Sequence, residues 1–373
     1  MNIAFYSPIK PPDHPVPSGD RTMANQLIAA LQLAGHRVAL ASRLRSYSAS
    51  PDHSDIETSA ALEADRLISS WSNENAANKP DAWFTYHPYY KAPDLIGPAV
   101  CSALDIPYMT AEASYSPRRQ TGEWQAAQTH VIEAVRQAQV NFCMTSIDRA
   151  GLSRIVGHDR LSDLPAFIDT STCRTAATRR ASGPSCQLIT VAMMRRGVKF
   201  DSYELLAAAL RELDCKEWSL AIIGDGSARG DVAGLFDGID ADRIEWLGEL
   251  SGDEVRNHLA QSDIFVWPGY GEAYGLAYLE AQACGLPVVA QDTHGVPSVV
   301  RGGITGLLTP PGDAIAFAEA IGQLASDDEL RARMSLEAHR FVHQERNLAV
   351  ASFILNQALV RARTPVSSET VAS

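Results

Sequence analysis

The chain has 373 residues, of which 46 % are hydrophobic and 20 % are charged, and its formal net charge is −12. This length and composition are typical of a globular protein with two domains of ordinary size. The negative charge argues against non-specific binding to nucleic acid and against broad adhesion to anionic lipid. No stretch reaches the ~18 consecutive apolar residues of a membrane span, and the N-terminus lacks the basic segment and apolar run of a signal peptide.

The six cysteines are scattered along the chain, without a Cys-x-x-Cys pair and without a cluster with histidine. This pattern predicts reduced thiols and no zinc site. We therefore expect a cytoplasmic protein whose membrane association is at most peripheral, at the inner membrane face.

Strands and helices alternate from the N-terminus, with an apolar strand at 2–6, a helix after Gly19 and a strand at 37–41. Such a unit opens a parallel sheet. Further strands are predicted at 82–86, 106–110 and 140–144, and further helices at 56–71 and 123–138. The carboxyl ends of parallel strands open towards a ligand crevice, so His87 and Glu112, which follow two of these strands, are candidate cleft residues. The alternative for each is a capping or solvated loop residue.

A second alternating half follows residues 170–185, which lack apolar periodicity and read as a linker. Its predicted strands are 187–192, 219–223, 244–248, 264–267 and 287–290, and its last helices are 313–326, 328–343 and 347–362. Arg195, Arg196 and Lys199 are expected in the turn between the first of these strands and a helix capped by Asp201. Cations in such a turn suit the neutralisation of a diphosphate, and a solvated basic loop is the alternative.

The stretch from Pro268 to Pro287 has the highest concentration of features that indicate a functional site. Its first part holds three glycines that permit sharp backbone turns, at Gly269, Gly271 and Gly275. A helix is predicted from Gly275, and a glycine-bearing turn into a helix N-terminus binds anions because unpaired N–H groups face the ligand. Glu272 lies in the turn and Glu280 in the helix. A buried strand, turn and helix with two solvated glutamates is the alternative.

The pattern Pro268…Glu272-x-x-Gly275-Leu276…Glu280-Ala…Ala283-Cys-Gly285-x-Pro287 resembles the signature of the family 4 glycosyltransferases, with two glutamates separated by seven residues. The resemblance covers most of the chain and is sharpest from 264 to 313. It implies the α/β GT-B fold, in which two doubly wound, Rossmann-like domains face each other across a cleft. It also implies a retaining, hexosyltransferase-type enzyme that moves a sugar from a UDP- or GDP-type donor to a carbohydrate or lipid-linked acceptor, as in polysaccharide or glycolipid biosynthesis.

On this resemblance the chain divides into two domains and a returning helix. Residues 1–169 form the acceptor-side domain, 170–185 the linker, 186–345 the nucleotide-sugar-binding domain, 346–362 a C-terminal helix that crosses back to the first domain, and 363–373 a tail.

The resemblance also implies roles for individual residues. Glu272 is the main catalytic candidate, and Glu280 is expected to accept hydrogen bonds from the ribose hydroxyls. Glu112 is a second catalytic candidate, because it stands near the position where many members have a histidine that reaches the donor sugar. His87 is an acceptor-side candidate. The expected donor-binding residues are Gly19, Arg195, Lys199, Gly248, Leu250, Gly275, Leu276, Ala277 and Glu280.

We expect no metal and no other cofactor, because Arg195, Lys199 and the helix N–H groups neutralise the leaving diphosphate. Arg195 is a substitute for the family's arginine, since Met193 stands at that position.

Three alternatives remain open from the sequence. A catalytically silent nucleotide-sugar-binding protein is compatible with the departures at Met193, Glu112 and Ser298, and a GT-B sugar epimerase would need no acceptor. A nicotinamide-dependent oxidoreductase would use Gly224-Asp-Gly226, although that segment spaces as GxGxxxG, one residue longer than the dinucleotide fingerprint. The donor sugar, the base, the acceptor and the oligomeric state are not determined by the sequence.

Overall fold

The structure is a computed structural model that describes residues 1–73, 79–173, 185–215 and 217–363. Two compact α/β units make up the chain: Met1–Pro165 with Leu348–Ser373, and Ala166–Asn347. Residues 174–184 of the expected linker and 364–373 of the expected tail lie outside the described residues. No helix in the described part of the chain is both long and apolar enough to cross a bilayer.

The first unit is built on a six-stranded parallel sheet in the order β2-β1-β3-β4-β5-β6. Its strands are β1 (Asn2–Tyr6), β2 (Arg37–Leu40), β3 (Ala82–Tyr86), β4 (Tyr108–Ala111), β5 (Val140–Cys143) and β6 (Leu161–Asp163). Its helices are α1 (Gly19–Leu33), α2 (Ser54–Asn73), α3 (Gly97–Leu104), α4 (Gln125–Gln137), α5 (Ser146–Leu152) and α12 (Leu348–Arg363).

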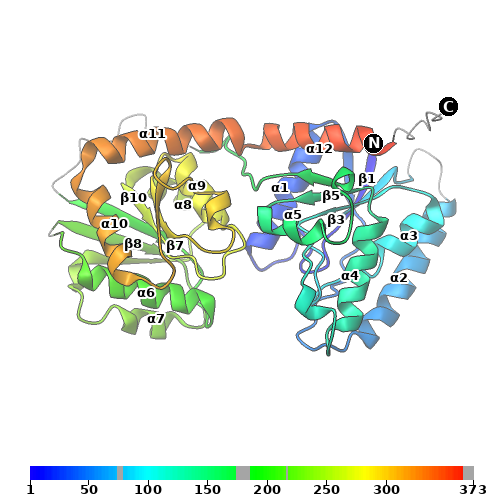
Figure 1. Ribbon diagram of the computed structural model, residues 1–373, viewed down its shortest axis with the longest axis horizontal. Coiled ribbons are helices and arrows are strands. Elements are labelled where there is room, and N and C mark those ends of the chain that lie inside the picture. The colour runs from blue at the N-terminus through cyan, green and yellow to red at the C-terminus, as the bar shows by residue number, and fades with distance from the viewer. Residues whose placement is uncertain (74–78, 174–184, 216, 364–373) are drawn as a thin grey trace. The chain divides into compact units, whose positions relative to one another are not determined.

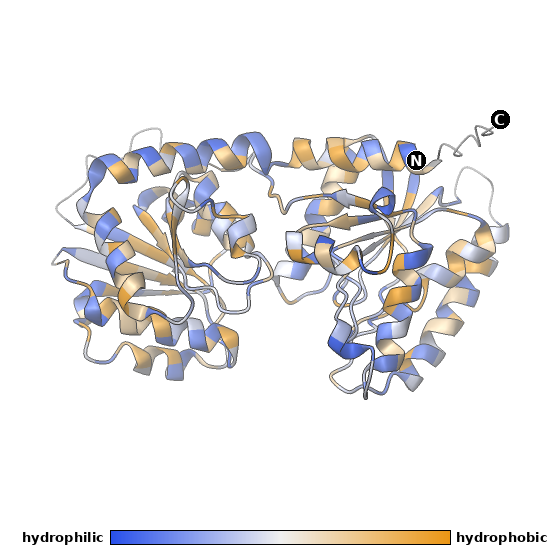
Figure 2. Cartoon of the chain, viewed as in Figure 1, coloured by the Kyte–Doolittle hydropathy of each residue, from blue (hydrophilic) through white to orange (hydrophobic). Residues whose placement is uncertain are grey.

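The core of this unit forms because the central strands are buried on both faces. Tyr6 and Trp83, on β1 and β3, are fully buried among apolar side chains of α2, α3 and α4. Helix α12 packs against α1, so the C-terminal helix belongs to this unit. Figure 2 shows the corresponding pattern, with hydrophobic strands and mixed helices.

The second unit repeats the plan with the order β12-β11-β10-β7-β8-β9, again all parallel. Its strands are β7 (Cys186–Val191), β8 (Trp218–Ile223), β9 (Ile244–Gly248), β10 (Ile264–Val266), β11 (Val288–Gln291) and β12 (Gly306–Thr309). Its helices are α6 (Val198–Glu212), α7 (Arg229–Leu235), α8 (Gly252–Gln261), α9 (Leu276–Ala283), α10 (Ala314–Ser326) and α11 (Asp328–Glu345). In Figure 1, α6 and α7 lie on one side of this sheet and α8, α9 and α11 on the other.

Each sheet has one point where the strand order reverses. In the first unit it lies between β1 and β3, and in the second between β7 and β10. The loops that leave the carboxyl ends of two such strands run to opposite faces of the sheet, which opens a crevice where doubly wound proteins bind ligands. The prediction of two Rossmann-like α/β domains is confirmed.

Several elements differ from expectation. Helix α6 begins at Val198 with Gly197 as its N-cap, rather than at Asp201, so Lys199 lies in the helix and not in the preceding turn. Helices α3, α5 and α7 were not predicted. Each has eight residues or fewer, which is too short to show a helical period in the sequence.

Gly224 and Gly226, the basis of the dinucleotide alternative, are needed by the chain itself. Both have positive φ, at 142° and 151°, and an added Cβ would lie 1.9 Å from the carbonyl oxygen of Ala192 and 2.2 Å from that of Met194, respectively. The two glycines therefore let the loop after β8 pack directly on the backbone that follows β7. A ligand is not required to explain them.

We predict that Gly224→Ala lowers the free energy of unfolding by about 1–3 kcal/mol, because the new methyl group overlaps a backbone oxygen that cannot rotate away. Gly230→Ala is the matched control, since Gly230 lies in α7 with no atom within 4 Å of an added Cβ. The control should stabilise the helix by about 0.5–1 kcal/mol. Urea unfolding of both variants measures the difference, and equal effects would contradict the packing role.

Candidate functional site

The reversal point of the second sheet carries a half-buried ion pair. Lys199, in the first turn of α6, pairs with Glu272, in the loop after β10. The Lys199 side chain is 17 % exposed and that of Glu272 16 %. The indole N–H of Trp267 donates to the same carboxylate at 3.1 Å, and the Lys199 ammonium lies 5.5 Å from the centre of that ring. Trp267 was not predicted as a site residue.

The glycines of the loop after β10 are required by its path. Gly269, Gly271 and Gly275 all have positive φ, as the predicted sharp turns need. A Cβ at Gly271 would lie 2.9 Å from Val198, the residue next to Lys199. The close approach of the two loops thus depends on glycine, and it brings Glu272 to Lys199.

Helix α9 begins directly after this loop, and its N-cap, Gly275, makes no side-chain capping bond. The first N–H groups of a helix have no intrahelical acceptor. Those of Leu276 and Ala277 therefore form a site where an anion can bind at the positive end of the helix dipole.

Glu280 lies on α9, as predicted. Burial raises the pKa of this carboxyl group to about 7, and the nearby positive charge of Arg256 only partly offsets the effect. The pKa of Glu280 in the folded protein lies above the ordinary value for glutamate. The protonated carboxyl group therefore contributes to the stability of the fold at low pH, and this contribution is lost as the pH rises through 7. The carboxyl group is therefore poised to exchange its proton when it gains hydrogen-bond donors from a ligand.

The basic residues after β7 fall into two classes. Arg196 pairs with Asp231 and lies 4.9 Å over the ring of Phe200. Arg195 is exposed and has no ion-pair partner in the described part of the chain. Of these two arginines, Arg195 therefore has the guanidinium that is available to a ligand.

Gly248 and Leu250, the expected neighbours of the base, are half-buried residues at the end of β9. Gly248 has a φ of 70°, and its carbonyl accepts a hydrogen bond of 2.7 Å from the N–H of Gly224. This bond ties the end of β9 to the loop after β8.

The reversal point of the first sheet carries a histidine between carboxylates. The His87 Nδ1 lies 3.0 Å from Asp20 Oδ1 and 3.8 Å from Glu112 Oε1. His87 and Glu112 follow β3 and β4 directly, and both have positive φ, at 58° and 55°. Such a conformation is costly for residues other than glycine, and it clusters at functional sites. The structure brings together these two predicted residues and adds Asp20.

The charge of His87 is set by its neighbours. Burial by itself would lower its pKa, but the carboxylates of Glu112 and Asp20 outweigh burial and raise it to about 9. His87 is therefore an imidazolium at neutral pH. Asp148, which caps α5 together with Thr145, also acts on His87 electrostatically. Asp20 and Asp148 were both missed, although each stands two or three residues after a Ser or Thr cap at the start of a helix.

Gly19 is the first residue of α1, after the N-cap Ser18. An added Cβ there would meet nothing within 4 Å, and its φ is not in the left-handed region. Neither backbone conformation nor packing within the chain requires glycine at this position.

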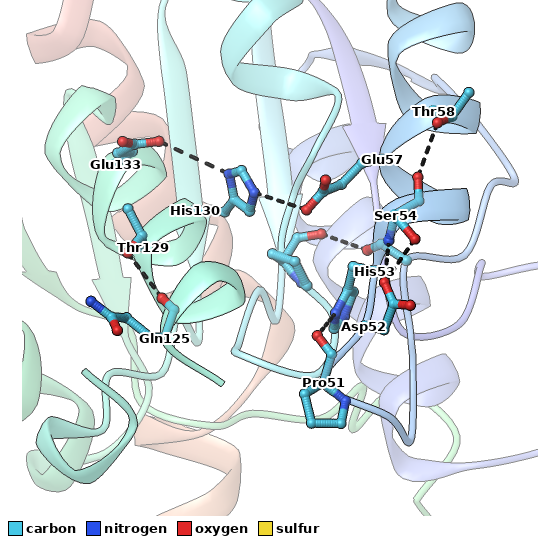
Figure 3. Close-up of polar contacts among 12 residues, drawn as sticks. Pro51, Asp52, His53, Ser54, Glu57, Thr58, Gln125, Thr129, His130 and Glu133 are labelled. Carbon is cyan, nitrogen blue, oxygen red and sulfur yellow. Dashed lines mark hydrogen bonds and ion pairs between the residues drawn. The ribbon is translucent and has the colours of Figure 1, made fainter. Parts of the chain in front are cut away.

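One cavity, of about 300 Å³, lies away from these residues, between α2, α3 and α4. Its wall includes Glu57, Glu133 and His130, and His130 Nε2 lies 3.2 Å from Glu57 Oε1 (Figure 3). The cavity is acidic, so it does not suit a phosphate group.

The chain also holds an Asp-x-Asp sequence, Asp240-Ala-Asp242. Asp240 accepts from the N–H of Asp242 at the start of a short 3₁₀ turn, Ala241–Arg243, and both side chains are exposed. The turn-capping bond accounts for the first of these aspartates.

Known structures resemble the fold described above, and a known family matches the segment that contains the second reversal point. Sucrose-phosphate synthase from Thermosynechococcus elongatus matches with a TM-score of 0.73 and 19 % identity, covering 97 % of this chain and 98 % of that one. Anabaena HepE, solved in complex with UDP-glucose, matches with a TM-score of 0.72 and 16 % identity over 97 % and 100 %. The two units thus have the GT-B fold of glycosyltransferases.

Residues 185–327 match the family of glycosyl transferases group 1, so the second unit contains a domain of that type. D-inositol 3-phosphate glycosyltransferase from Corynebacterium jeikeium is 32 % identical over 188 residues, which cover 46 % of this chain and 44 % of that protein. The chain spans less than half the length of the curated relatives it matches.

We predict that the ring protons of His87 titrate near pH 9 and that Glu112→Gln moves this midpoint towards neutral pH, because one of the three carboxylates that raise the pKa loses its charge. The raised pKa means that the stabilisation by this pairing is fully present below pH 6.5 and is lost as the pH rises through 9. NMR titration measures both. Glu123→Gln is the control, since Glu123 is exposed in the segment between β4 and α4. A wild-type midpoint near 6.5 would contradict the pairing.

Proposed function

We propose that this protein is a retaining, hexosyltransferase-type glycosyltransferase that uses a UDP- or GDP-sugar. The observation that carries the proposal is the Lys199–Glu272 pair at the β7/β10 reversal point, next to the uncapped start of α9. It lies inside the segment that matches the glycosyl transferases group 1 family. A UDP donor is favoured by HepE, which was solved with UDP-glucose.

The leaving diphosphate is the negative charge that such a site must stabilise. Lys199 and Arg195 supply cations after β7, and Leu276 and Ala277 supply helix N–H groups. Donors that are already oriented before the reaction stabilise developing charge without reorganisation, which is the largest catalytic contribution in many enzymes. We propose that these groups act without a metal ion or another cofactor.

Glu280 suits the ribose of the nucleotide. Its carboxyl group is largely buried on α9 and has a raised pKa, so two hydroxyl donors would favour its ionised form. Orientation of the ribose fixes the donor relative to Glu272.

Glu272 would then lie beside the donor sugar. In this proposal the carboxylate of Glu272 stabilises the positive charge that develops on the sugar, and its ion-pair partner Lys199 stabilises the negative charge of the departing diphosphate. Retention is consistent with a departing phosphate that takes the acceptor proton itself, so no conventional general base is assigned.

His87 is proposed to position the acceptor, and Glu112 is proposed to position the donor sugar. The protein is proposed to act in the cytoplasm.

A screen of UDP-, GDP- and ADP-sugars in the presence of a metal chelator tests this function. We predict that one nucleotide class raises the melting temperature and is slowly hydrolysed, and that Glu272→Gln abolishes most turnover while nucleotide binding persists. Glu204→Gln, which changes an exposed glutamate on α6, is the control for charge.

Binding without turnover in a broad mixture of acceptors would favour a silent binding protein. Turnover of the donor without an acceptor product would favour an epimerase. Unchanged turnover in Glu272→Gln would contradict its role.

We predict that Lys199→Ala weakens the binding of a nucleoside diphosphate by about ten- to a hundredfold and leaves the nucleoside nearly unchanged, as expected for loss of one charged hydrogen bond of about 1.5–3 kcal/mol. Arg196→Ala is the control, because Arg196 is an exposed neighbouring cation that pairs with Asp231 on α7 and not with Glu272. Isothermal titration calorimetry with both ligands gives the ratio. Equal losses for the two ligands would count against a phosphate contact.

A further inference from the structure

A row of aromatic rings leads away from His87 along the loops of the first unit. We call His87, Tyr89, Tyr90 and Trp124 the aromatic row. The centres of successive rings are 5.4, 5.4 and 4.9 Å apart. All four side chains are half-buried, so each ring is packed on one side and reachable on another. Rings in this state suit the apolar faces of sugars.

Two cations converge on one ring of this row. The Arg119 guanidinium lies 4.8 Å from the centre of Tyr90, and the Lys91 ammonium lies 6.0 Å from the same centre and 5.7 Å from that of Trp124. Neither cation has an acidic ion-pair partner among the described residues. Attraction to the rings stabilises each cation, but no carboxylate in the described part of the chain neutralises either charge. A bound anion would supply a negative charge to these cations.

The loops that carry the row are fixed to each other by backbone bonds. The N–H of Ser48, after β2, donates to the carbonyl of Lys91 at 2.8 Å, and the N–H of Ser114, after β4, donates to that of Pro88 at 3.1 Å. Tyr89 and Ala92 form a β-bridge within the loop after β3. The cations are therefore held on an ordered support, which reduces the entropy lost on binding.

The surroundings confine an anion to this part of the row. At one end, His87 is surrounded by the carboxylates of Asp20 and Glu112. Beyond Trp124, the ring of His53 lies 6.0 Å away, and behind it Glu57 and Glu133 flank His130 (Figure 3). Both ends are acidic, and the net charge of the chain is −12. The pair Lys91 and Arg119 is a local exception.

We propose that Lys91 and Arg119 bind the carboxylate or phosphate group of an anionic carbohydrate acceptor whose sugar rings lie along the aromatic row towards His87. This inference rests on the proposed function, because it names the acceptor of that transfer. It assigns the acceptor's charge to Lys91 and Arg119 and its reacting hydroxyl to the end of the row at His87.

Calorimetric binding to the full-length protein tests the inference with two matched pairs of probes. One pair is trigalacturonate and its neutral methyl ester, and the other is glucose 6-phosphate and glucose. We expect at least one anion to bind about tenfold more tightly than its neutral partner, a difference of about 1.4 kcal/mol. The pair that shows the preference identifies carboxylate or phosphate as the group bound.

Lys91→Ala and Arg119→Ala should each remove most of that preference. Arg118→Ala is the control, because Arg118 is exposed on the same 3₁₀ turn, Pro117–Arg119, and contacts no ring of the row. Circular dichroism at each variant's binding temperature establishes that it is folded. Equal binding of charged and neutral probes, no binding of either anion, or an equal loss in Arg118→Ala would overturn the inference.

The same samples separate this inference from the proposed function. Hydrolysis of the nucleotide-sugar donor by the wild type is measured beside the anion preference, because the proposed diphosphate site at Lys199 and the start of α9 does not include Lys91 or Arg119. If the wild type turns over a donor but shows no anion preference, the inference fails and the proposed function stands. If it prefers the anion but turns over no donor, the proposed function fails, and the site remains only as an anion site.

Discussion

The reversal of strand order in two parallel sheets is the constraint on which the rest of this structure depends. All described strand pairings are parallel, so within each sheet the carboxyl ends lie at one edge. At β1/β3 and at β7/β10, the segments that follow the two adjacent strands leave towards opposite faces of the sheet. No crossover connection therefore covers the crevice between those two strand ends. Two residues with positive φ, His87 and Glu112, follow β3 and its neighbour β4, and the Lys199–Glu272 pair lies in the segments after β7 and β10.

The two reversal points differ in their charge balance. In the second unit a single lysine meets a single glutamate, and the pair is neutral until a ligand arrives. In the first unit one imidazolium faces Asp20 and Glu112, so the site is net negative. A buried charge is costly without a partner. Both arrangements hold charged side chains beside partners of opposite charge at a reversal point.

Glycine serves separate purposes in this chain. At Gly224 and Gly226 it allows one backbone to pack on another, and at Gly271 it allows two site loops to approach. At Gly19 neither need exists, so no contact within the chain explains glycine at that position. Residue type alone does not separate these cases, because the same absence of Cβ serves all of them.

The sequence alone determined the alternation of strands and helices, the turn at Pro268–Gly275 and the helix that carries Glu280, because these depend on local periodicity and on the backbone freedom of glycine. It also placed His87 and Glu112 directly after strands. Only the tertiary structure decided which charges meet. The partners of Lys199 and His87 lie 73 and 67 residues away in the chain, and no local pattern links them. Short helices such as α5, and with them Asp148, were likewise fixed by packing against the sheet, since one or two turns are too few to be stable or visible in the sequence alone.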